Sequence, residues 1–483
     1  MTVSRIKHFL LSYWPEIVLL LLFGWIFFYR LGGDPLENWD EGWYATIAQT
    51  MADDGDFLTM KWLSNPFVDH PPLSIWLQSL SIWVFGGWEF SVRLHSALLG
   101  LGTMIVLYRL GLALFDKKMV GFAASFILGT SLWYVLRVRS GNMDSTLVFF
   151  YVLTVFLAFL SRRNIRMLPF TLASFGALMI SKSLVGLAAI VVIVFWNWHH
   201  LVQIKKTWKM LAVGVGAFCA VVMPWYGYTL IQMPGFLSYQ LFGIAMRNRE
   251  AGSFLNISFE QPLFYLFIGV RKWYKMWLVG MGVLLVRLSW LKAEVAGLFV
   301  WLIVVLYPFL TKDMTGIWHL LPVYPPLALL TAYGIYELYQ TGFDFFKTKT
   351  YFLWIRPWML TGVYLVTFAV VGIIQIKNLI PDVIPHNYYV PPEVDVSRQL
   401  SDYPGDVFLN DEWLPVANFY SKRLILMLKF NSGELATLEG MLLSGKPAAI
   451  ITPNDSLDWL DQHGVDYSIY YRNDGFSVVT SNL

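Results

Sequence analysis

Two adjacent carboxylates, Asp40 and Glu41, lie in the string NWDEGWYA directly after the first long apolar run of the chain. Acidic side chains are costly close to a bilayer, so a pair at this place suggests a function. One carboxylate could accept the proton of an attacking hydroxyl, or the pair could help to bind a divalent cation such as Mg²⁺ or Mn²⁺. The simpler alternative is that both acids complement the dipole at a helix N-terminus.

Other side chains that could do chemistry occur in short polar strings between apolar runs. They are His70 in VDHPP, Arg137, Arg139 and Asp144 in RVRSGNMDS, Lys182 in SKS, Arg247 and Arg249 in MRNRE, and His319 in WHLLP. Lys, Arg and His donate hydrogen bonds to phosphate oxygens, so this set suits an anionic ligand. Simpler interpretations are that the basic residues snorkel at span ends and that Asp144 caps a helix starting near Ser145.

Composition places these strings in an integral membrane protein. Of the 483 residues, 57% are hydrophobic and 14% charged, against roughly a quarter charged in ordinary globular domains. The single cysteine, Cys219, excludes a disulfide framework and a cysteine-based metal site. The chain has no Walker motif, GxGxxG or HExxH, so neither ATP-driven transport nor a dinucleotide site has support, and no nucleic-acid partner is expected.

The elements that must position the polar strings are membrane helices. Eleven spans are predicted, at roughly 15–31, 91–115, 118–136, 146–161, 167–182, 184–201, 208–230, 274–289, 295–311, 320–339 and 357–379. With an uncleaved N-terminal anchor and the N-terminus inside, five Lys- and Arg-rich loops all fall on the inner side. The apolar stretch 71–86 is short, so it is predicted to be an interfacial helix beside one that starts near Glu41.

This threading predicts two domains. Residues 1–380 form the transmembrane domain, in which 32–90 is a large first external loop that includes a solvated turn at Asp53, Asp54 and Asp56. Residues 381–483 carry 14 acidic and 6 basic side chains and form a small external α/β domain. Its strands are expected at VFLND, LILML, AAIIT and DYSIYYR, and its helices near 394–402, 433–442 and 454–462.

The same threading brings all the polar strings to the external face. Basic residues on that face depart from the positive-inside tendency, and this departure suggests a ligand. The chemistry that fits is sugar transfer from a lipid phosphate. A carboxylate takes the proton of an acceptor hydroxyl as the oxygen attacks the anomeric carbon, and Arg, Lys, His or a divalent cation neutralises the departing phosphate.

The motifs WDEGWYA, DHPPLSIWL and RSGNMDS, in that order, resemble those of the GT-C glycosyltransferases, as does WHLLPVYPPLALL. The nearest subgroups are the lipid A aminoarabinose transferases and the protein O-mannosyltransferases. The resemblance covers about residues 1–340. It implies an all-α polytopic GT-C fold with external juxtamembrane helices, to which the small α/β domain is added. It also implies an inverting transferase that uses a polyprenyl-phosphate sugar, in a bacterial inner membrane with its site on the periplasmic side.

The resemblance also implies roles for individual residues. Asp40 matches the catalytic base or metal-associated acid, Glu41 its partner, and Asp144 the acid of the second external loop, which could share a metal ion with Asp40. Lys182, Arg247 and Arg249 match positions that contact the carrier phosphate. The aminoarabinose transferases carry a Lys before the proline pair, where this chain has His70, so donor or metal handling is expected to differ.

Two functions of other classes are compatible with part of this pattern. One is a transporter or flippase of lipid-linked sugars, and the other is a membrane-anchored binding protein. Transporters place their polar sites near the bilayer midplane, whereas the polar strings of this chain collect at one face, which favours the enzyme. The sugar is open, and so is the acceptor, which could be lipid A or another glycolipid, a polysaccharide or a protein.

Overall fold

The computed structural model of the protein describes residues 3–244, 257–311, 316–347, 356–384, 389–410, 414–428 and 447–480, called the described residues below. The chain packs into two compact units. The helical unit comprises Met1–Tyr29, Asp69–Ser74 and Ser96–His386. The loop–sheet unit comprises Arg30–Val68, Ile75–His95 and Asn387–Leu483. The predicted first external loop therefore packs largely with the C-terminal residues.

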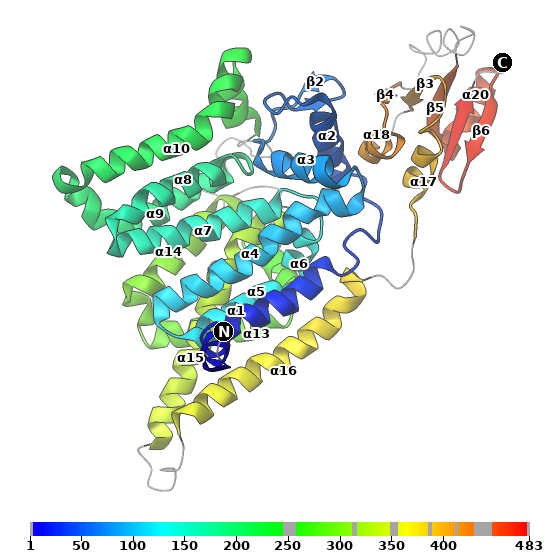
Figure 1. The fold of residues 1–483 in the computed structure, drawn as a ribbon. Coiled ribbons are helices and arrows are strands. Elements are labelled where there is room, and N and C mark those ends of the chain that lie inside the picture. Colours follow the sequence, from blue (N-terminus) through cyan, green and yellow to red (C-terminus); the bar gives the residue numbers. More distant parts are fainter. Residues whose placement is uncertain are drawn as a thin grey trace. The chain divides into compact units, whose positions relative to one another are not determined.

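Long apolar helices build the helical unit (Figure 1). Within the described residues, seven are long and apolar enough to cross a membrane: α1 (Val3–Phe28), α4 (Glu89–Phe115), α7 (Asp144–Arg163), α9 (Ala189–Val202) with the end of η2 (Ser183–Ala188), α10 (Ile204–Gln232), α14 (Ala293–Leu310) and α16 (Pro357–Val383). The pair α5 (Lys118–Gly129) and α6 (Leu132–Val138) is long and apolar enough only when the two helices are taken together, and it is bent by 73° at the break between them.

The other helices of this unit are α8 (Leu168–Met179), α12 (Glu260–Val270), α13 (Trp273–Val286) and α15 (Tyr324–Lys347). Short turns lie at η1 (Ile165–Met167), α11 (Phe236–Ser238), η3 (Tyr239–Ile244), η5 (Ser289–Leu291) and η6 (Ile317–Val323). Each of the eleven predicted spans coincides with a helix or with the bent pair, which confirms the all-α polytopic fold class. Helix α12 was not predicted, because an apolar run of 11 residues is too short to indicate a span.

The bend between α5 and α6 has a local cause in two hydroxyl side chains. Thr130 Oγ1 donates to the Phe126 carbonyl at 2.6 Å and Ser131 Oγ donates to the Ile127 carbonyl at 2.8 Å, and such bonds bend helices. Neighbouring helices bind the polar groups at the break. Gln375 Nε2 donates to the Thr130 carbonyl, and Trp273 Nε1 donates to Thr130 Oγ1, both at 2.9 Å. The break is thus a stable feature, and it gives α6, which carries Arg137, a direction different from that of α5.

Two helices occupy the predicted first external loop, as expected. Helix α2 (Asp40–Asp54) belongs to the loop–sheet unit, where the hairpin β1–β2 (Lys61–Trp62 and Asn65–Pro66) follows it. Helix α3 (Leu73–Phe85) has 13 residues and rises only about 20 Å, too little to cross a bilayer. Its first turn is held in the helical unit, because the Leu73 N–H donates to the Ile180 carbonyl at 2.9 Å.

The C-terminal residues form a five-stranded sheet of order β4-β3-β5-β7-β6. The strands are β3 (Asp406–Leu409), β4 (Leu426–Met427), β5 (Ala448–Pro453), β6 (Ser468–Arg472) and β7 (Phe476–Thr480), and the helices are α17 (Pro392–Arg398), α18 (Pro415–Ser421), η8 (Asn454–Ser456) and α20 (Leu457–Gln462). Strand β3 is parallel to both neighbours, whereas β7 is antiparallel to both of its own. All four predicted strands are present. Strand β7 and helix α18 were missed, and the helix predicted at 433–442 lies outside the described residues.

Helix α2 of the first loop packs directly on helix α18 (Figure 1). Thr46 Oγ1 donates to the Pro415 carbonyl at 3.2 Å. The Tyr420 hydroxyl accepts the Leu36 N–H at 2.8 Å and donates to the Glu89 carboxylate at 2.9 Å. Burial, together with that carboxylate, raises the pKa of Tyr420 far above its usual value, so the phenol stays protonated and keeps donating. The loop and the sheet domain thus share one folded core.

The α2–α18 packing gives a stability prediction. A Cβ at Gly42 would lie 2.5 Å from Val416 Cγ1 and 3.0 Å from the Val416 backbone nitrogen. Gly42→Ala should therefore lower the apparent Tm of the detergent-purified protein, since overpacking costs about 1–3 kcal/mol. Gly24→Ala in α1 is the matched control, because nothing lies within 4 Å of its added Cβ. That change should be neutral or slightly stabilising. A rise in Tm for Gly42→Ala would contradict the close packing.

Candidate functional site

A buried ion cluster lies where helix α7 begins. The Asp144 carboxylate, 2% exposed, forms an ion pair with Lys182 Nζ through Oδ1, and its Oδ2 lies 3.5 Å from Arg137 Nε. Both basic side chains are only 8% exposed. One negative and two positive charges thus share a buried place. The cluster carries a net positive charge and lies at the N-terminus of a helix, where anions are stabilised.

These residues lie at the ends of three different helices. Asp144 is the first residue of α7, and Arg137 is in the last turn of the short helix α6 that follows the bend. Lys182 follows α8 in extended backbone conformation, with φ −162° and ψ 109°. The Arg137 guanidinium lies over the ring of Trp318, 4.7 Å from its centroid. A cation held on an aromatic face keeps its position without a second carboxylate.

His319 belongs to the same neighbourhood. Its Nδ1 accepts the Gly316 N–H at 3.0 Å, and its ring stacks on Phe309 at 5.6 Å between centroids. A neutral ring that accepts at Nδ1 carries its proton on Nε2, which is then a donor. The ring also interacts electrostatically with the Asp144 carboxylate. Four residues that the sequence singled out therefore converge: Arg137, Asp144, Lys182 and His319.

Several buried polar atoms close to this cluster have no hydrogen-bond partner among the described residues. They are Arg137 Nε, Thr146 Oγ1, Asn142 Oδ1 and Trp133 Nε1. An unpaired buried donor or acceptor costs about 1–3 kcal/mol, so a fold retains several together only for a reason. Their position in chain segments 133–146, around Asp144, marks this part of the helical unit as a place for a polar ligand.

The acid pair Asp40–Glu41 lies in the loop–sheet unit, at the start of α2. Glu41 is 1% exposed and forms a two-point ion pair with Arg93, with Nε to Oε1 at 2.7 Å and Nη2 to Oε2 at 2.8 Å. Its Oε2 also accepts the Glu37 N–H at 2.9 Å. The geometry thus gives Glu41 a structural task. Asp40, half-buried, is the member of the pair that lies outside this ion pair.

Arg93 is the residue that the sequence analysis missed. It lies in α4 near the start of a membrane span, and its remaining N–H groups donate to the carbonyls of Leu31 at 3.1 Å, Asp34 at 2.8 Å and Pro35 at 2.8 Å. All five guanidinium donors are therefore used. The signal that could have revealed it is an arginine inside the apolar run SVRLHSALL, because a buried arginine requires a carboxylate partner.

The other predicted site residues are Arg139, His70, Arg247 and Arg249. Arg139 Nη1 donates to the carbonyls of Ile26 at 2.8 Å and Phe27 at 3.2 Å, so it caps the C-terminal end of α1. His70 precedes α3 beside Asp69, whose carboxylate accepts the Tyr239 hydroxyl at 2.5 Å. Arg247 and Arg249 lie outside the described residues. The donor-binding roles of His70, Arg139, Arg247 and Arg249 stay predictions.

The side chains around Asp144 do not favour the predicted metal ion. Two basic side chains already lie against its oxygens, and a divalent cation would be repelled by both. Among the described residues no three His, Cys, Asp or Glu side chains gather in a way that could hold a metal ion. The donor set at Asp144 therefore fits an anion better than a cation. A metal ion at Asp40 stays a prediction.

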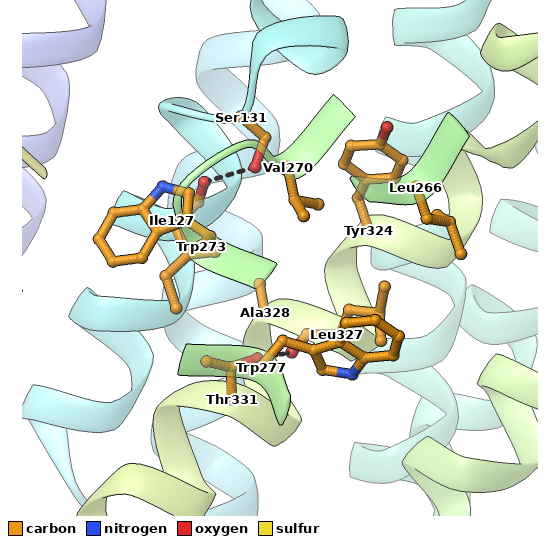
Figure 2. Close-up of a pocket in the computed structure, with 10 residues that line it drawn as sticks. All are labelled: Ile127, Ser131, Leu266, Val270, Trp273, Trp277, Tyr324, Leu327, Ala328 and Thr331. Atoms are coloured by element: carbon orange, nitrogen blue, oxygen red, sulfur yellow. Dashed lines mark hydrogen bonds between the residues drawn. The ribbon is translucent and has the colours of Figure 1, made fainter. Parts of the chain in front are cut away.

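A separate cavity lies deeper in the helical unit, between α5, α12, α13 and α15 (Figure 2). Its volume is about 10 Å³, room for a single water molecule. Ser131 Oγ, in the break after α5, donates to the Ile127 carbonyl of α5, and Thr331 Oγ1 donates to the Leu327 carbonyl of its own helix, α15. The cavity is too small for a sugar, so it is part of the membrane core and not a substrate site.

Comparison with known proteins finds a family model, curated proteins and solved structures that are similar to this chain. Residues 69–228 match the family model of the dolichyl-phosphate-mannose-protein mannosyltransferases. An undecaprenyl phosphate-alpha-4-amino-4-deoxy-L-arabinose arabinosyl transferase of Aeromonas hydrophila is 25% identical over 339 residues, 66% of this chain and 59% of that protein. The chain spans about three fifths of the length of the curated relatives that it matches over most of its own length.

Two solved structures share the fold over nearly the whole chain. ArnT from Cupriavidus metallidurans in the apo state superposes with a TM-score of 0.73 at 17% identity, covering 96% of this chain and 97% of that one. The same protein has also been solved bound to undecaprenyl phosphate. The oligosaccharyltransferase AglB from Archaeoglobus fulgidus superposes with a TM-score of 0.56 at 12% identity, covering 98% and 75%. Both the membrane helices and the C-terminal domain thus have counterparts.

The ion cluster gives a prediction about stability. Asp144→Asn leaves Lys182 and Arg137 buried without a carboxylate, and removing one partner of a buried ion pair costs about 3–5 kcal/mol. Asp144→Asn should therefore lower the apparent Tm strongly, whereas adding Lys182→Met should recover part of the loss. Glu294→Gln is the control, because its pair with Arg162 is about a third exposed and such pairs contribute little. Strictly additive Tm losses for Asp144→Asn and Lys182→Met would contradict direct coupling.

Proposed function

We propose that this chain, which has the GT-C fold of the lipid A aminoarabinose transferases and protein O-mannosyltransferases, is a glycosyltransferase that uses a polyprenyl-phosphate sugar. The observation that carries this proposal is the buried, net-positive cluster of Arg137, Lys182 and Asp144 at the start of α7. Support also comes from the relatives, which are named as transferases of lipid-phosphate sugars, and from a solved relative bound to undecaprenyl phosphate. The lipid tail of such a donor requires a membrane protein.

The cluster supplies the phosphate site. Its single carboxylate balances only one of two buried cations, so a phosphate oxygen restores electroneutrality. That oxygen also gives Arg137 Nε a hydrogen-bond acceptor, which Asp144 Oδ2, 3.5 Å away, does not supply. His319 Nε2 contributes a further donor. Asp144 acts through Lys182 and Arg137, which it holds in place when no anion is bound. Positive charge preset around the phosphate also stabilises the negative charge that grows on it as the glycosidic bond breaks.

Asp40 is the proposed general base. It removes the proton of the acceptor hydroxyl while that oxygen attacks the anomeric carbon, and the carrier phosphate leaves from the opposite face. One displacement inverts the anomeric configuration. The support for Asp40 is its place in the WDEGWYA motif and the commitment of its neighbour Glu41 to Arg93. Glu41 is then a positioning residue, which fixes the first turn of α2 and with it the Asp40 carboxylate.

The proposed reaction takes place on the external side of a bacterial inner membrane. The positive-inside pattern supports a cytoplasmic N-terminus with the acid pair and the C-terminal domain outside. The acceptor is a hydroxyl of a glycolipid, a polysaccharide or a protein. A flippase would bind the same donor without cleaving it, so release of free carrier phosphate separates the two functions.

Turnover tests the function and the base together. Purified protein, given undecaprenyl-phosphate sugars one at a time and envelope lipids of a deletion strain as acceptors, should release free undecaprenyl phosphate. Asp40→Asn should lower this rate about 10²- to 10⁴-fold, the usual loss for a general base, with the apparent Tm unchanged. Asp402→Asn, on an exposed residue of the sheet domain, should leave the rate unchanged. Near-normal turnover by Asp40→Asn would show that another group is the base.

Cysteine labelling tests the orientation. In a Cys219→Ser background, Asp458→Cys places a thiol on an exposed residue of α20, and Lys205→Cys places one on an exposed residue of a predicted inner loop. A membrane-impermeant maleimide should label Asp458→Cys in intact spheroplasts and Lys205→Cys only after permeabilisation. The reverse result would place the C-terminal domain in the cytoplasm and overturn the proposed site of action.

A further inference from the structure

The loop–sheet unit contains a polar cleft of about 680 Å³. This volume lies within the range of small-molecule sites, roughly 300–1,000 Å³. The lining comes from both ends of the sequence: Thr46, Gln49, Thr50, Asp53 and Asp54 of α2, Lys61, Leu63 and Ser64 of the β1–β2 hairpin, Gly87, and Asn418, Phe419, Lys422, Arg423 and Leu424 of α18 and the turn after it. The cleft thus exists because the first external loop packs on the C-terminal domain.

One wall of the cleft is held rigidly by the turn that ends α18. Lys422 adopts a left-handed backbone conformation with φ 54°. The Arg423 guanidinium donates to three backbone carbonyls, of Leu400, Tyr403 and Gly405. The Asn418 amide donates to the Arg423 carbonyl at 3.2 Å. Arg423 and Asn418 are therefore structural, and their contribution is the shape of the wall.

The opposite wall offers hydrogen-bonding groups that include both acidic and basic side chains. Gln49 Nε2 donates to Asp53 Oδ1 at 2.8 Å, and Lys61 Nζ pairs with Asp54 Oδ2 at 2.8 Å. The hydrogen bond and the charge of Asp54 raise the pKa of Lys61, so this amine stays charged. Asp53 and Asp54 are exposed, as the sequence predicted, but they are the last two residues of α2 and not part of a turn. The turn follows at Asp56, which is half-buried and whose Oδ1 accepts the N–H groups of Leu58 and Thr59.

The charges and hydrogen-bonding groups of the lining indicate the kind of ligand. The lining has three basic side chains, but Lys61 is paired with Asp54 and the Arg423 guanidinium with backbone carbonyls, so a phosphate group would meet Lys422 together with the Asp53 and Asp54 carboxylates. A lipid chain would have to desolvate those same charges. Vicinal hydroxyls, in contrast, both donate and accept, so they match carboxylates, an amide, an amine and the hydroxyls of Thr50 and Ser64. Phe419, which is 5% exposed, adds apolar lining.

We propose that this cleft binds a glycan, and that this glycan is the carbohydrate part of the acceptor. Binding stands on the cleft alone, whereas the acceptor role rests on the proposed function. Thr50 and Asp54 are on the same helix as Asp40 and lie within about 80° of it around the axis. Thr50 is about 15 Å farther along that axis. A short oligosaccharide spans this distance, so one held in the cleft could present a hydroxyl to Asp40.

A binding experiment tests the proposal without requiring turnover. Full-length protein in detergent is applied to an array of bacterial envelope oligosaccharides that also carries inorganic phosphate and peptide spots. Wild-type protein should bind at least one glycan. Thr50→Trp, which fills the cleft, should weaken that binding by about tenfold or more, and Gln49→Ala, which removes one hydrogen-bonding amide, by about two- to tenfold.

The control is Gln462→Trp, which adds the same bulk on an exposed residue of α20 outside the cleft. It should bind like wild type. If no glycan binds, or if the glycans bind equally to Thr50→Trp, the proposal is overturned even where turnover is normal. Binding to phosphate spots that depends on the cleft would overturn it in favour of an anion. Glycan binding without turnover would instead contradict only the proposed function.

Discussion

The ion pair between Glu41 and Arg93 is the constraint on which the loop–sheet unit depends. Arg93 is in α4, near the start of a membrane span, where an unpaired guanidinium would be very costly to bury. The fold meets this cost by folding the chain from Leu31 to Glu41 around it, with three carbonyls and one carboxylate as acceptors. That path fixes where α2 begins. The position of Asp40, the packing of α2 on α18 and the polar cleft all follow from it.

The two buried ion clusters differ in a way that separates structure from function. At Arg93 the charges cancel and every guanidinium donor has an acceptor, so the arrangement is closed. At Asp144 two cations share one carboxylate, and a buried Arg137 nitrogen has no hydrogen-bond partner within the described residues. A cluster whose charges and hydrogen bonds are balanced stabilises a fold, whereas a cluster with an excess positive charge and an unused donor can bind an anion. This contrast, more than the number of charged residues, identifies where the donor phosphate is expected.

Much of the helical unit could be predicted from the sequence, because helices that cross a bilayer are long apolar runs of residues. Long apolar runs were enough for the eleven helical segments. The prediction that the polar strings gather together is met by Arg137, Asp144, Lys182 and His319, which lie in one neighbourhood. Arg93 was hidden because one charge barely alters the mean hydropathy of α4. The role of Glu41 was hidden too, since its partner is 52 residues away and no local pattern encodes that pairing.

The loop–sheet unit was harder to predict from the sequence, because several of its elements are short. Strands β3 and β5 read clearly as apolar runs, but α18 and β7 are short and are held by contacts distant in sequence. The packing of α2 on α18 depends on the small Gly42 facing Val416, a fit of shapes that no periodicity reveals. The sequence assigned Asp53 and Asp54 to solvent, and both are exposed, but it gave no sign of the wall opposite them. Once α18 is placed against α2, the same two carboxylates face a cleft, and residues more than 360 positions apart line one surface. Under the proposed function, this cleft gives the acceptor a rigid wall in the loop–sheet unit. The proposed donor site is built for an anion, whereas the cleft carries acidic and basic side chains together, so the proposed acceptor is selected by its hydroxyls instead of its charge.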